Sequence, residues 1–240
     1  MISRWIARAL RLPLRLVAPG TVMRIRTGPL RGRRWVAGTA THGCWIGTYE
    51  RETQRVFEQS VRPGGVVYDI GANAGFFTLL ASKLAGPSGK VYAFEPLPRN
   101  LAVLREHVRL NGAENVEVMP LAISDRAGMA RFATADDPAM GGLSERGVLE
   151  VDTTSLDTIR GTIAPPSFIK MDIEGAEYAA LSGAMEVLRT AKPVILLSAH
   201  GYVQHERCTG LLLGLGYSMT ILVDGTADGN YVLLARSESS

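Results

Sequence analysis

Two glycines and an asparagine follow a short apolar run, in a pattern that is typical of a ligand-binding loop. The run covers residues 66–70 and leads into Gly71, Asn73 and Gly75. Glycines there let the backbone turn sharply and let a ligand approach the main chain. Asn73 stands where a dinucleotide-binding loop carries its second glycine, and it can donate and accept hydrogen bonds. The pattern favours a ligand without phosphates, and the simpler alternative is a plain tight turn.

Glu95 ends the next apolar run, residues 91–94, and comes 24 residues after Gly71. A carboxylate at this place can accept two hydrogen bonds from the vicinal hydroxyls of a ribose. The alternative is an acid on a solvent-exposed loop. Asp69, just before the glycines, can meet the cationic amino-acid end of a ligand directly or through water. Together these residues favour S-adenosylmethionine over NAD as the ligand.

Three acids, Asp172, Glu174 and Glu177, follow a further apolar run at residues 168–171. In an in-line methyl transfer, alignment supplies much of the acceleration, and an acceptor hydroxyl must lose its proton to a nearby base. We expect Asp172 beside the transferred methyl group, with a structural cap as its alternative role. Glu174 and Glu177 suit either catalysis or the first turn of a following helix.

His200 follows the apolar run at residues 194–198 and is the best histidine candidate for the same proton transfer, because an imidazole exchanges protons near neutral pH. A hydrogen bond to a neighbouring loop is its alternative role. Oxygen ligands suit magnesium, so the acids near Asp172 could hold a divalent ion. No spacing in the chain demands a metal, and we assign none.

All these residues fall at the ends of strands in a chain that alternates strands with helices. We expect the main strands at residues 66–70, 91–94, 116–122, 168–171 and 194–198, with helices at 50–61, 76–84, 97–110, 177–189 and 205–214. Further strands are expected at 129–133 and 149–153, and an antiparallel pair at 217–223 and 230–235. Such alternation specifies a parallel sheet covered on both faces, and ligands bind at the carboxyl ends of its strands.

Three segments, residues 69–75, 94–96 and 169–177, together resemble the FkbM family of S-adenosylmethionine-dependent methyltransferases. The resemblance covers about residues 50–235, and the last segment is its most specific part. It implies an α/β class I methyltransferase fold, Rossmann-like, with seven strands in the order 3-2-1-4-5-7-6. It also implies O-methylation of small molecules or glycans.

The same resemblance assigns cofactor contacts to Asp69, Gly71, Asn73 and Glu95. Ser124 and Asp125, after the third strand, occupy the region that usually contacts the adenine. The chain departs from the family pattern at residues 198–200, where a glutamate commonly ends the strand.

The length of 240 residues allows one sizeable α/β domain. The net charge of +3 is uneven, because no acidic residue precedes Glu50 while nine arginines do. We therefore divide the chain into a basic N-terminal extension, residues 1–49, and a methyltransferase domain, residues 50–240. Cys44 and Cys208 lie far apart in the sequence and are expected to be buried thiols in a reducing compartment.

The N-terminal extension is expected to hold a helix over residues 2–17 and short strands or a hairpin near 22–26 and 34–37. Four arginines share one face of that helix: Arg4, Arg8, Arg11 and Arg15. The helix either lies on an anionic membrane surface or packs on the domain with its arginines solvated. No secretory signal or membrane-spanning run is visible, so the expected location is cytoplasmic, with peripheral contact at the inner face of the membrane as an option.

The sequence leaves three functions open. The first is O-methyl transfer from S-adenosylmethionine to a hydroxyl of a sugar, glycan, glycolipid or small natural product. An NAD-linked oxidoreductase shares Glu95 but lacks the glycine that a pyrophosphate needs. The third is a non-catalytic module that binds a membrane surface and keeps a vestigial pocket. We expect no nucleic-acid partner, because the chain has neither the catalytic Asn-Pro-Pro-aromatic tetrapeptide nor a catalytic cysteine motif.

Overall fold

The central strands are short apolar runs flanked by turn-forming residues. β3 (Val66–Ile70) is followed by Gly71, and β10 (Phe168–Met171) comes shortly after Pro165 and Pro166. Every side chain of β10 is buried, as expected of a strand that is covered on both faces. The computed structural model describes residues 17–133, 142–143 and 149–237, and it places both strands in the middle of one sheet.

The seven-stranded sheet has the order β12-β13-β11-β10-β3-β4-β5. Its remaining strands are β4 (Lys90–Phe94), β5 (Val116–Met119), β11 (Val194–His200), β12 (Tyr217–Val223) and β13 (Asn230–Ser237). β13 runs antiparallel to both of its neighbours, and the other pairs are parallel. Counted from β3 along the chain, this is the order 3-2-1-4-5-7-6, so the predicted class I methyltransferase topology is confirmed.

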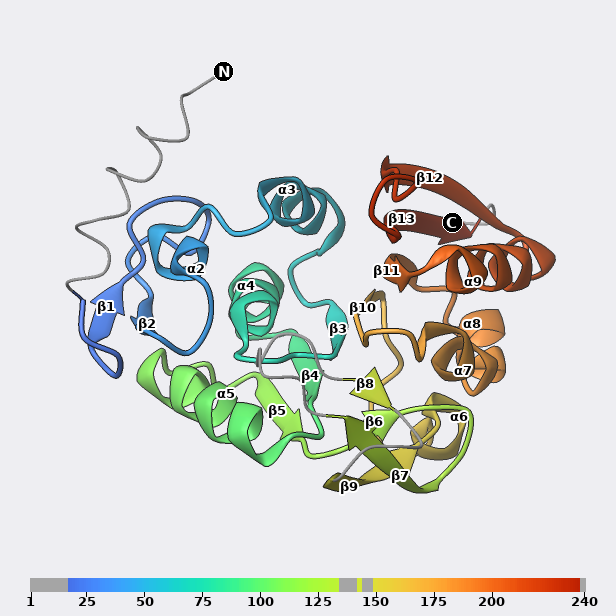
Figure 1. The fold of residues 1–240 in the computed structure, drawn as a ribbon, viewed down its shortest axis with the longest axis horizontal. Helices are drawn as coiled ribbons and strands as arrows, with labels where there is room; N and C mark the ends of the chain where they lie inside the picture. The colour runs from blue at the N-terminus through green and yellow to red at the C-terminus, as the bar shows by residue number, and fades with distance from the viewer. Residues whose placement is uncertain (1–16, 134–141, 144–148, 238–240) are drawn as a thin grey trace.

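Helices cover both faces of this sheet (Figure 1). On one face lie α3 (Arg51–Ser60), α4 (Phe76–Ala85) and α5 (Pro98–Leu110), and on the other α7 (Glu177–Ser182), α8 (Met185–Thr190) and α9 (Tyr202–Gly214). Alternate residues of β3 serve the two layers: Val67 packs in the cluster with α4, and Tyr68 in the cluster with α7 to α9. The period of two along each strand thus divides the core into two halves.

A second sheet of four short strands is inserted between β5 and β10, in the order β6-β9-β7-β8. It consists of β6 (Ala122–Ile123), β7 (Gly128–Ala133), β8 (Gly142–Leu143) and β9 (Leu149–Thr154), and α6 (Leu156–Ile159) follows it. The single strand predicted over residues 116–122 is therefore wrong. It breaks at Pro120, which has no N–H to donate to a ladder, and its last residue belongs to the second sheet.

The single helix predicted over residues 177–189 is also wrong, because α7 and α8 are separate. The break falls at Gly183, where a Cβ would lie 2.3 Å from the carbonyl oxygen of Ser124. The loop after β6 comes so close that no side chain fits there. Two predicted ends also move: β11 continues to His200, and α9 begins at Tyr202.

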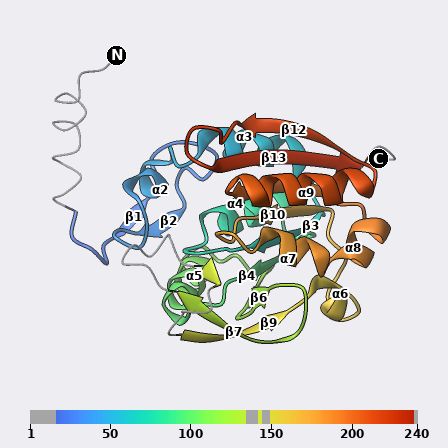
Figure 2. The same ribbon diagram turned by 45° about the vertical axis from the view of Figure 1, so that its right-hand side comes forward.

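The described part of the N-terminal extension packs on α4 and α5 (Figures 1 and 2). It forms the predicted hairpin, β1 (Val22–Arg24) with β2 (Arg34–Val36), and a short helix that was not predicted, α2 (His42–Ile46). Trp35 and Trp45 belong to the same hydrophobic cluster as Phe77 of α4. The division of the chain at residue 50 stays a prediction, and residues 1–16 of the predicted N-terminal helix lie outside the described residues.

Within the described ranges, none of the helices combines the length and the apolar character needed to cross a membrane.

His107 of α5 ties the N-terminal hairpin to the loop after β3. Its Nδ1 donates to the Ala74 carbonyl oxygen over 2.7 Å, its Nε2 accepts from the Val36 N–H over 2.9 Å, and its ring stacks on Trp35 at 3.9 Å between centroids. The two bonds require the neutral ring with its proton on Nδ1. Burial lowers the pKa of His107, although the bond to Ala74 opposes this in part.

We expect His107 to make folding stability depend on pH. Because its pKa is lowered in the folded protein, its contribution is complete above the ordinary histidine pKa of about 6.5 and is lost as the pH falls below that value. His107→Phe should cost about 1–3 kcal/mol at pH 7.5, since two backbone groups lose their partner. It should also flatten the pH dependence in urea unfolding. His42→Gln is the control, because His42 is exposed and glutamine can still accept the hydrogen bond that Trp45 Nε1 donates to its ring over 3.2 Å. An equal effect of both changes would contradict the assignment.

Candidate active site

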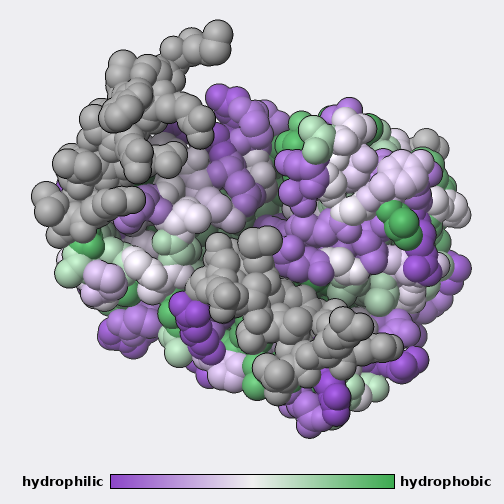
Figure 3. Space-filling view, viewed as in Figure 1, coloured by the Kyte–Doolittle hydropathy of each residue, from purple (hydrophilic) through white to green (hydrophobic). Residues whose placement is uncertain are grey.

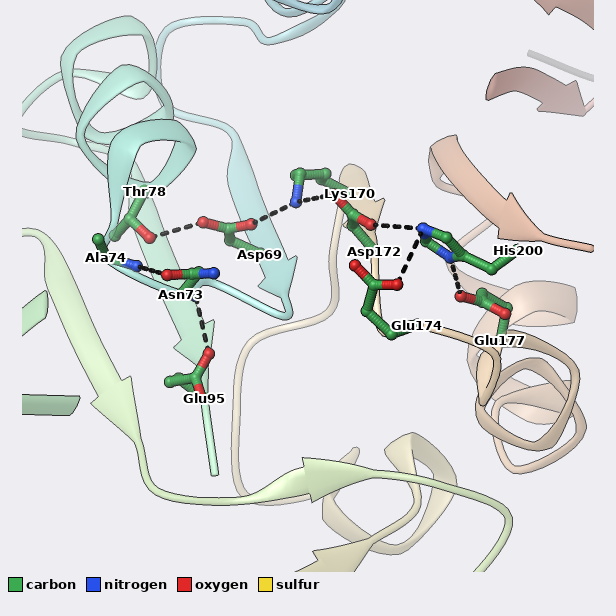
Figure 4. A network of polar contacts seen from close by, with 10 residues as sticks. All are labelled: Asp69, Asn73, Ala74, Thr78, Glu95, Lys170, Asp172, Glu174, Glu177 and His200. Carbon is green, nitrogen blue, oxygen red and sulfur yellow. Dashed lines mark hydrogen bonds and ion pairs between the residues drawn. The ribbon is translucent and has the colours of Figure 1, made fainter. Parts of the chain in front are cut away.

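Asp69 is fully buried near the end of β3, and neighbouring residues hold its carboxylate. The Thr78 hydroxyl donates to Asp69 Oδ2 over 2.6 Å, and Lys170 Nζ lies 3.8 Å from Oδ1 (Figure 4). Asp69 does not line the large cavity at this edge of the sheet, whereas Lys170 does. Asp69 thus lies behind Lys170 as seen from the cavity, and its contact with a ligand, direct or through water, stays a prediction.

Gly71 and Gly75 have left-handed backbone conformations, with φ of 80° and 90°. The need for glycine comes from neighbouring elements. A Cβ on Gly71 would lie 2.0 Å from the carbonyl oxygen of Asp172, and one on Gly75 would lie 2.4 Å from Leu104 Cδ1. Both glycines also line the cavity. The sequence predicted that a ligand comes close to these glycines. In the structure, the loop after β10 comes close to Gly71 and α5 comes close to Gly75.

Asn73 and Glu95 meet where β3 and β4 end. The Asn73 N–H donates to Glu95 Oε2 over 2.8 Å, and the Leu97 N–H donates to Oε1 over 2.9 Å. The amide oxygen of Asn73 accepts from the Ala74 N–H over 2.7 Å, and the two N–H donors of the same amide take no part in this bond. Each carboxylate oxygen has two lone pairs. These two bonds leave the Glu95 carboxylate with acceptor capacity for a ribose hydroxyl.

Glu95 is only 4% exposed, yet it lines the cavity. Burial raises the pKa of its carboxyl, and hydrogen bonds from the backbone of Leu97 and Asn73 and from the Asn100 side chain offset part of that rise. A buried acceptor with spare lone pairs, facing an open space, is what a ribose diol requires. These residues therefore fit the nucleoside part of S-adenosylmethionine.

Lys170 of β10 is a central residue that the motif contained but to which the sequence assigned no role. It is 5% exposed, and its Nζ lies between Asp69 Oδ1 at 3.8 Å and Asp172 Oδ2 at 3.4 Å. Burial lowers the pKa of Lys170, but Asp172 and Asp69 outweigh burial, and the net shift is upward. A lysine inside an otherwise apolar strand was the available signal, since lysine is almost never buried without a partner.

His200, at the end of β11, lies among three carboxylates. Its Nδ1 is 2.7 Å from Glu177 Oε1, and its Nε2 is 3.6 Å from both Asp172 Oδ1 and Glu174 Oε2 (Figure 4). Burial lowers the pKa of His200. The hydrogen bond to Glu177 and the charges of the three acids together raise it by more, so the net shift is upward. The fold thus brings together the candidates that the sequence placed after two different strands.

Glu174 and Glu177 take different places, although both are acids of one loop. Glu174 has a left-handed backbone, with φ of 53°, and burial raises the pKa of its carboxyl. Glu177 is fully buried in the first turn of α7, and its Oε1 also accepts from the Gly175 N–H over 2.9 Å. Glu177 therefore joins the start of α7 to the ring of His200.

Ser124 and Asp125 are not among the residues that line the cavity. They follow β6 in the second sheet, where the Ser124 N–H donates to the Thr154 carbonyl oxygen over 2.9 Å. The cavity wall near Glu95 is formed by three apolar residues that come just before them: Leu121, Ala122 and Ile123. Because the predicted third strand ends at Met119, its carboxyl end lies earlier in the sequence than expected.

The cavity has a volume of about 920 Å³ and joins two groups of residues. Its first end holds the loop from Gly71 to Gly75, Glu95 and the apolar wall. Its second end holds Lys170, Asp172, Glu174 and His200. The lining also includes residues of the N-terminal segment and of the C-terminal strands: Trp35, 38–41, Cys44, 49–53, Val223 and 230–232. On the face shown in Figure 3, hydrophilic side chains gather around the middle of the described surface.

The methyltransferase FkbM domain model matches residues 69–237. The chain is 43% identical over 81 residues to 31-O-demethyl-FK506 methyltransferase FkbM of Streptomyces tacrolimicus, a match of 33% of this chain and 30% of that protein. It is 29% identical over 170 residues to hexuronic acid methyltransferase AglP of Haloferax volcanii, covering 68% of this chain and 67% of AglP. A match to a ribosomal protein L11 methyltransferase spans 25% of that relative, so the chain covers under a third of two of these proteins.

Among solved structures, methyltransferase FkbM from Methylobacillus flagellatus KT superimposes with a TM-score of 0.56 at 20% identity, over 82% of this chain and 55% of that one. This likeness concerns the fold. The matched segment, residues 69–237, contains the polar residues assigned to both ends of the cavity, from Asn73 to His200. By sequence and by fold, the chain belongs to the FkbM family of S-adenosylmethionine-dependent methyltransferases.

Proposed function

We propose that the protein transfers a methyl group from S-adenosylmethionine to a hydroxyl oxygen of a sugar, a glycan, a glycolipid or a small natural product. The observation that carries this proposal is a single cavity that joins Glu95 at one end to the group of Asp172, Glu174 and His200 at the other. The names of two relatives support such acceptors, because one acts on a hexuronic acid and the other on demethyl-FK506.

The cofactor end is assigned from the residues that line it. Glu95 binds the ribose diol, the loop from Gly71 to Gly75 surrounds the methionine part, and residues 121–123 cover the adenine in place of Ser124 and Asp125. Asp69 supports this end by holding Lys170. When bound, S-adenosylmethionine supplies an electrophilic methyl group on a sulfonium, and the thioether keeps the electron pair of the broken carbon–sulfur bond.

The other end is assigned the handling of the acceptor hydroxyl. Asp172 and His200 face the same space, and either a carboxylate oxygen or the imidazole Nε2 takes the proton that the hydroxyl loses. Glu174 borders the same space. Because these groups are held by Lys170 and Glu177, they keep their positions without the acceptor, which favours alignment.

We assign the acceptor wall to residues of the N-terminal segment that carry hydroxyl groups. Thr39, Thr41, Tyr49 and Thr53 are among the residues that line the cavity. Hydroxyls pair with the hydroxyls of a sugar, and an aromatic ring packs against its apolar face. These residues precede residues 69–237, the segment that the family model matches.

The direct test is a screen for release of S-adenosylhomocysteine across neutral and acidic sugars, glycolipids and hydroxylated natural products. Turnover with any of these acceptors supports O-methyl transfer and contradicts a non-catalytic module. Calorimetry with S-adenosylmethionine, S-adenosylhomocysteine and NAD separates the methyltransferase from an oxidoreductase. Binding of NAD alone would overturn the proposal.

Glu95→Ala is expected to weaken S-adenosylmethionine binding by about 2 kcal/mol, or roughly 30-fold, because the ribose loses charge-assisted hydrogen bonds. Titration calorimetry measures this change. Glu117→Ala, at an acid of β5 paired with Lys90, is the control and should leave the affinity unchanged. An unchanged affinity in folded Glu95→Ala protein would remove Glu95 from the site.

For the N-terminal segment we expect co-sedimentation with anionic vesicles and not with neutral ones. Arg4, Arg8, Arg11 and Arg15 each contribute roughly 1 kcal/mol near an anionic surface. Raised salt should release the protein, since exposed charges are screened within about 10 Å at 0.1 M. Removal of residues 1–17 should abolish the binding and leave cofactor affinity unchanged. If the shortened protein unfolds or aggregates, the segment belongs to the core instead.

A further inference from the structure

The fold places three groups that can act as metal ligands around one point at the acceptor end of the cavity. They are Asp172, Glu174 and His200, and one ligand atom from each lies within 4.8 Å of the others. His200 Nε2 is 3.6 Å from the nearest oxygen of each acid. Two ligands bonded to one ion at about 2.1 Å are roughly 3–4 Å apart. Both distances from His200 Nε2 fall in this range, and both are longer than direct hydrogen bonds.

The ring of His200 is oriented as in metal sites of proteins. The fully buried Glu177 faces Nδ1 at 2.7 Å, and this contact leaves Nε2 directed at the two acids. Nε2 makes no hydrogen bond to the described residues. A carboxylate behind a histidine ligand is the usual second layer of a metal site, because it holds the tautomer and the ring orientation.

The oxygens of Asp172 are divided between two neighbours. Oδ2 is the oxygen near Lys170, at 3.4 Å, and Oδ1 is the oxygen near His200. Lys170 is also shared with Asp69, so a single ammonium group serves two carboxylates, and Glu174 and Glu177 add two more. The cluster therefore holds more carboxylates than cationic side chains, and a bound cation would offset part of this imbalance.

We propose that Asp172 Oδ1, Glu174 Oε2 and His200 Nε2 bind a divalent cation at the acceptor end of the cavity. Two carboxylates and one imidazole suit Mn²⁺ or Mg²⁺ better than a soft metal ion. The proposal rests on the proposed methyltransferase function, because it gives the ion a task there. A hydroxyl beside a divalent cation loses its proton at lower pH, and an acceptor hydroxyl would enter from the open side of the cluster. With Nε2 and Oδ1 bonded to the ion, that proton would pass to solvent water instead of to His200 or Asp172.

The test uses the full chain, freed of metal with a chelator and titrated with Mn²⁺ alone. We expect one ion per chain, seen by calorimetry and by the loss of the free Mn²⁺ signal in electron paramagnetic resonance. Asp172→Asn, Glu174→Gln and His200→Ala should each weaken binding by about 10-fold or more. Glu206→Gln is the matched control, since Glu206 also lies beside a histidine, His205, with 4.0 Å between their nearest atoms.

Two outcomes overturn the proposal. One is the absence of Mn²⁺ binding at concentrations up to about 1 mM, the range of the weakest cation sites. The other is binding that the three ligand variants leave unchanged. S-adenosylhomocysteine affinity, measured separately on each variant, shows that the protein is folded. If the unaltered chain does not bind S-adenosylhomocysteine, the cofactor assignment is refuted. The Mn²⁺ titration then still tests the metal site independently.

Discussion

Lys170→Met is expected to lower the free energy of unfolding by about 3–5 kcal/mol, because it leaves a buried carboxylate without its cation. Asp69 is fully buried, and after the change its oxygens keep only the hydrogen bond from Thr78. Methionine fills a similar volume and can keep the contact with the ring of Phe77, from which Lys170 Nζ lies 5.3 Å. The loss is therefore electrostatic and does not come from a cavity.

Urea unfolding of the double variant Lys170→Met with Asp69→Asn separates these causes. Removing the charge of Asp69 as well should restore much of the stability, with a coupling energy of about 1–3 kcal/mol. The control is Lys90→Met, which breaks an exposed pair with Glu117 and should change stability by less than about 1 kcal/mol. Equal losses of unfolding free energy in Lys170→Met and Lys90→Met would show that the buried ion pair stabilises the fold no more than the exposed one.

Asp172→Asn and His200→Ala are expected to leave S-adenosylmethionine affinity nearly intact, and at least one of them to slow turnover by about 100-fold or more. Both side chains border the acceptor end of the cavity, away from Glu95. Asparagine keeps the shape of Asp172, but its neutral amide cannot accept the proton of the hydroxyl or form an ion pair with a cation. The measurement is the rate of S-adenosylhomocysteine release with the best acceptor from the screen.

Asp125→Asn is the matched control for Asp172→Asn. Asp125 is an acid of the same family pattern, but it does not line the cavity, so its replacement should change neither turnover nor cofactor affinity. Wild-type rates in both Asp172→Asn and His200→Ala would place the proton acceptor elsewhere or show that the acceptor needs none. A slow Asp125→Asn variant would return the adenine contact to the position implied by the family resemblance.

The sequence alone determined the sheet and the family. Strand positions follow from the local sequence, because short apolar runs there end at glycine or proline. The alternation of strands with helices then leaves few possible topologies. For the same reason the ends of β3, β4, β10 and β11 were predictable as the edge where polar residues gather. The predicted boundaries were wrong where a contact distant in sequence decides them. At Pro120 the chain passes from the first sheet to the second, and at Gly183 the loop after β6 lies against the break between α7 and α8.

Only the tertiary structure decided which neighbours each polar residue has. Lys170 reads as one charge in a buried strand, and its position between Asp69 and Asp172 appears only once β3 and β10 pair in register. His200 meets Glu177 because β11 lies beside β10 and α7 begins behind it. Burial and charge act through distances that sequence separation does not determine, so the candidate residues could be named in advance and their contacts could not.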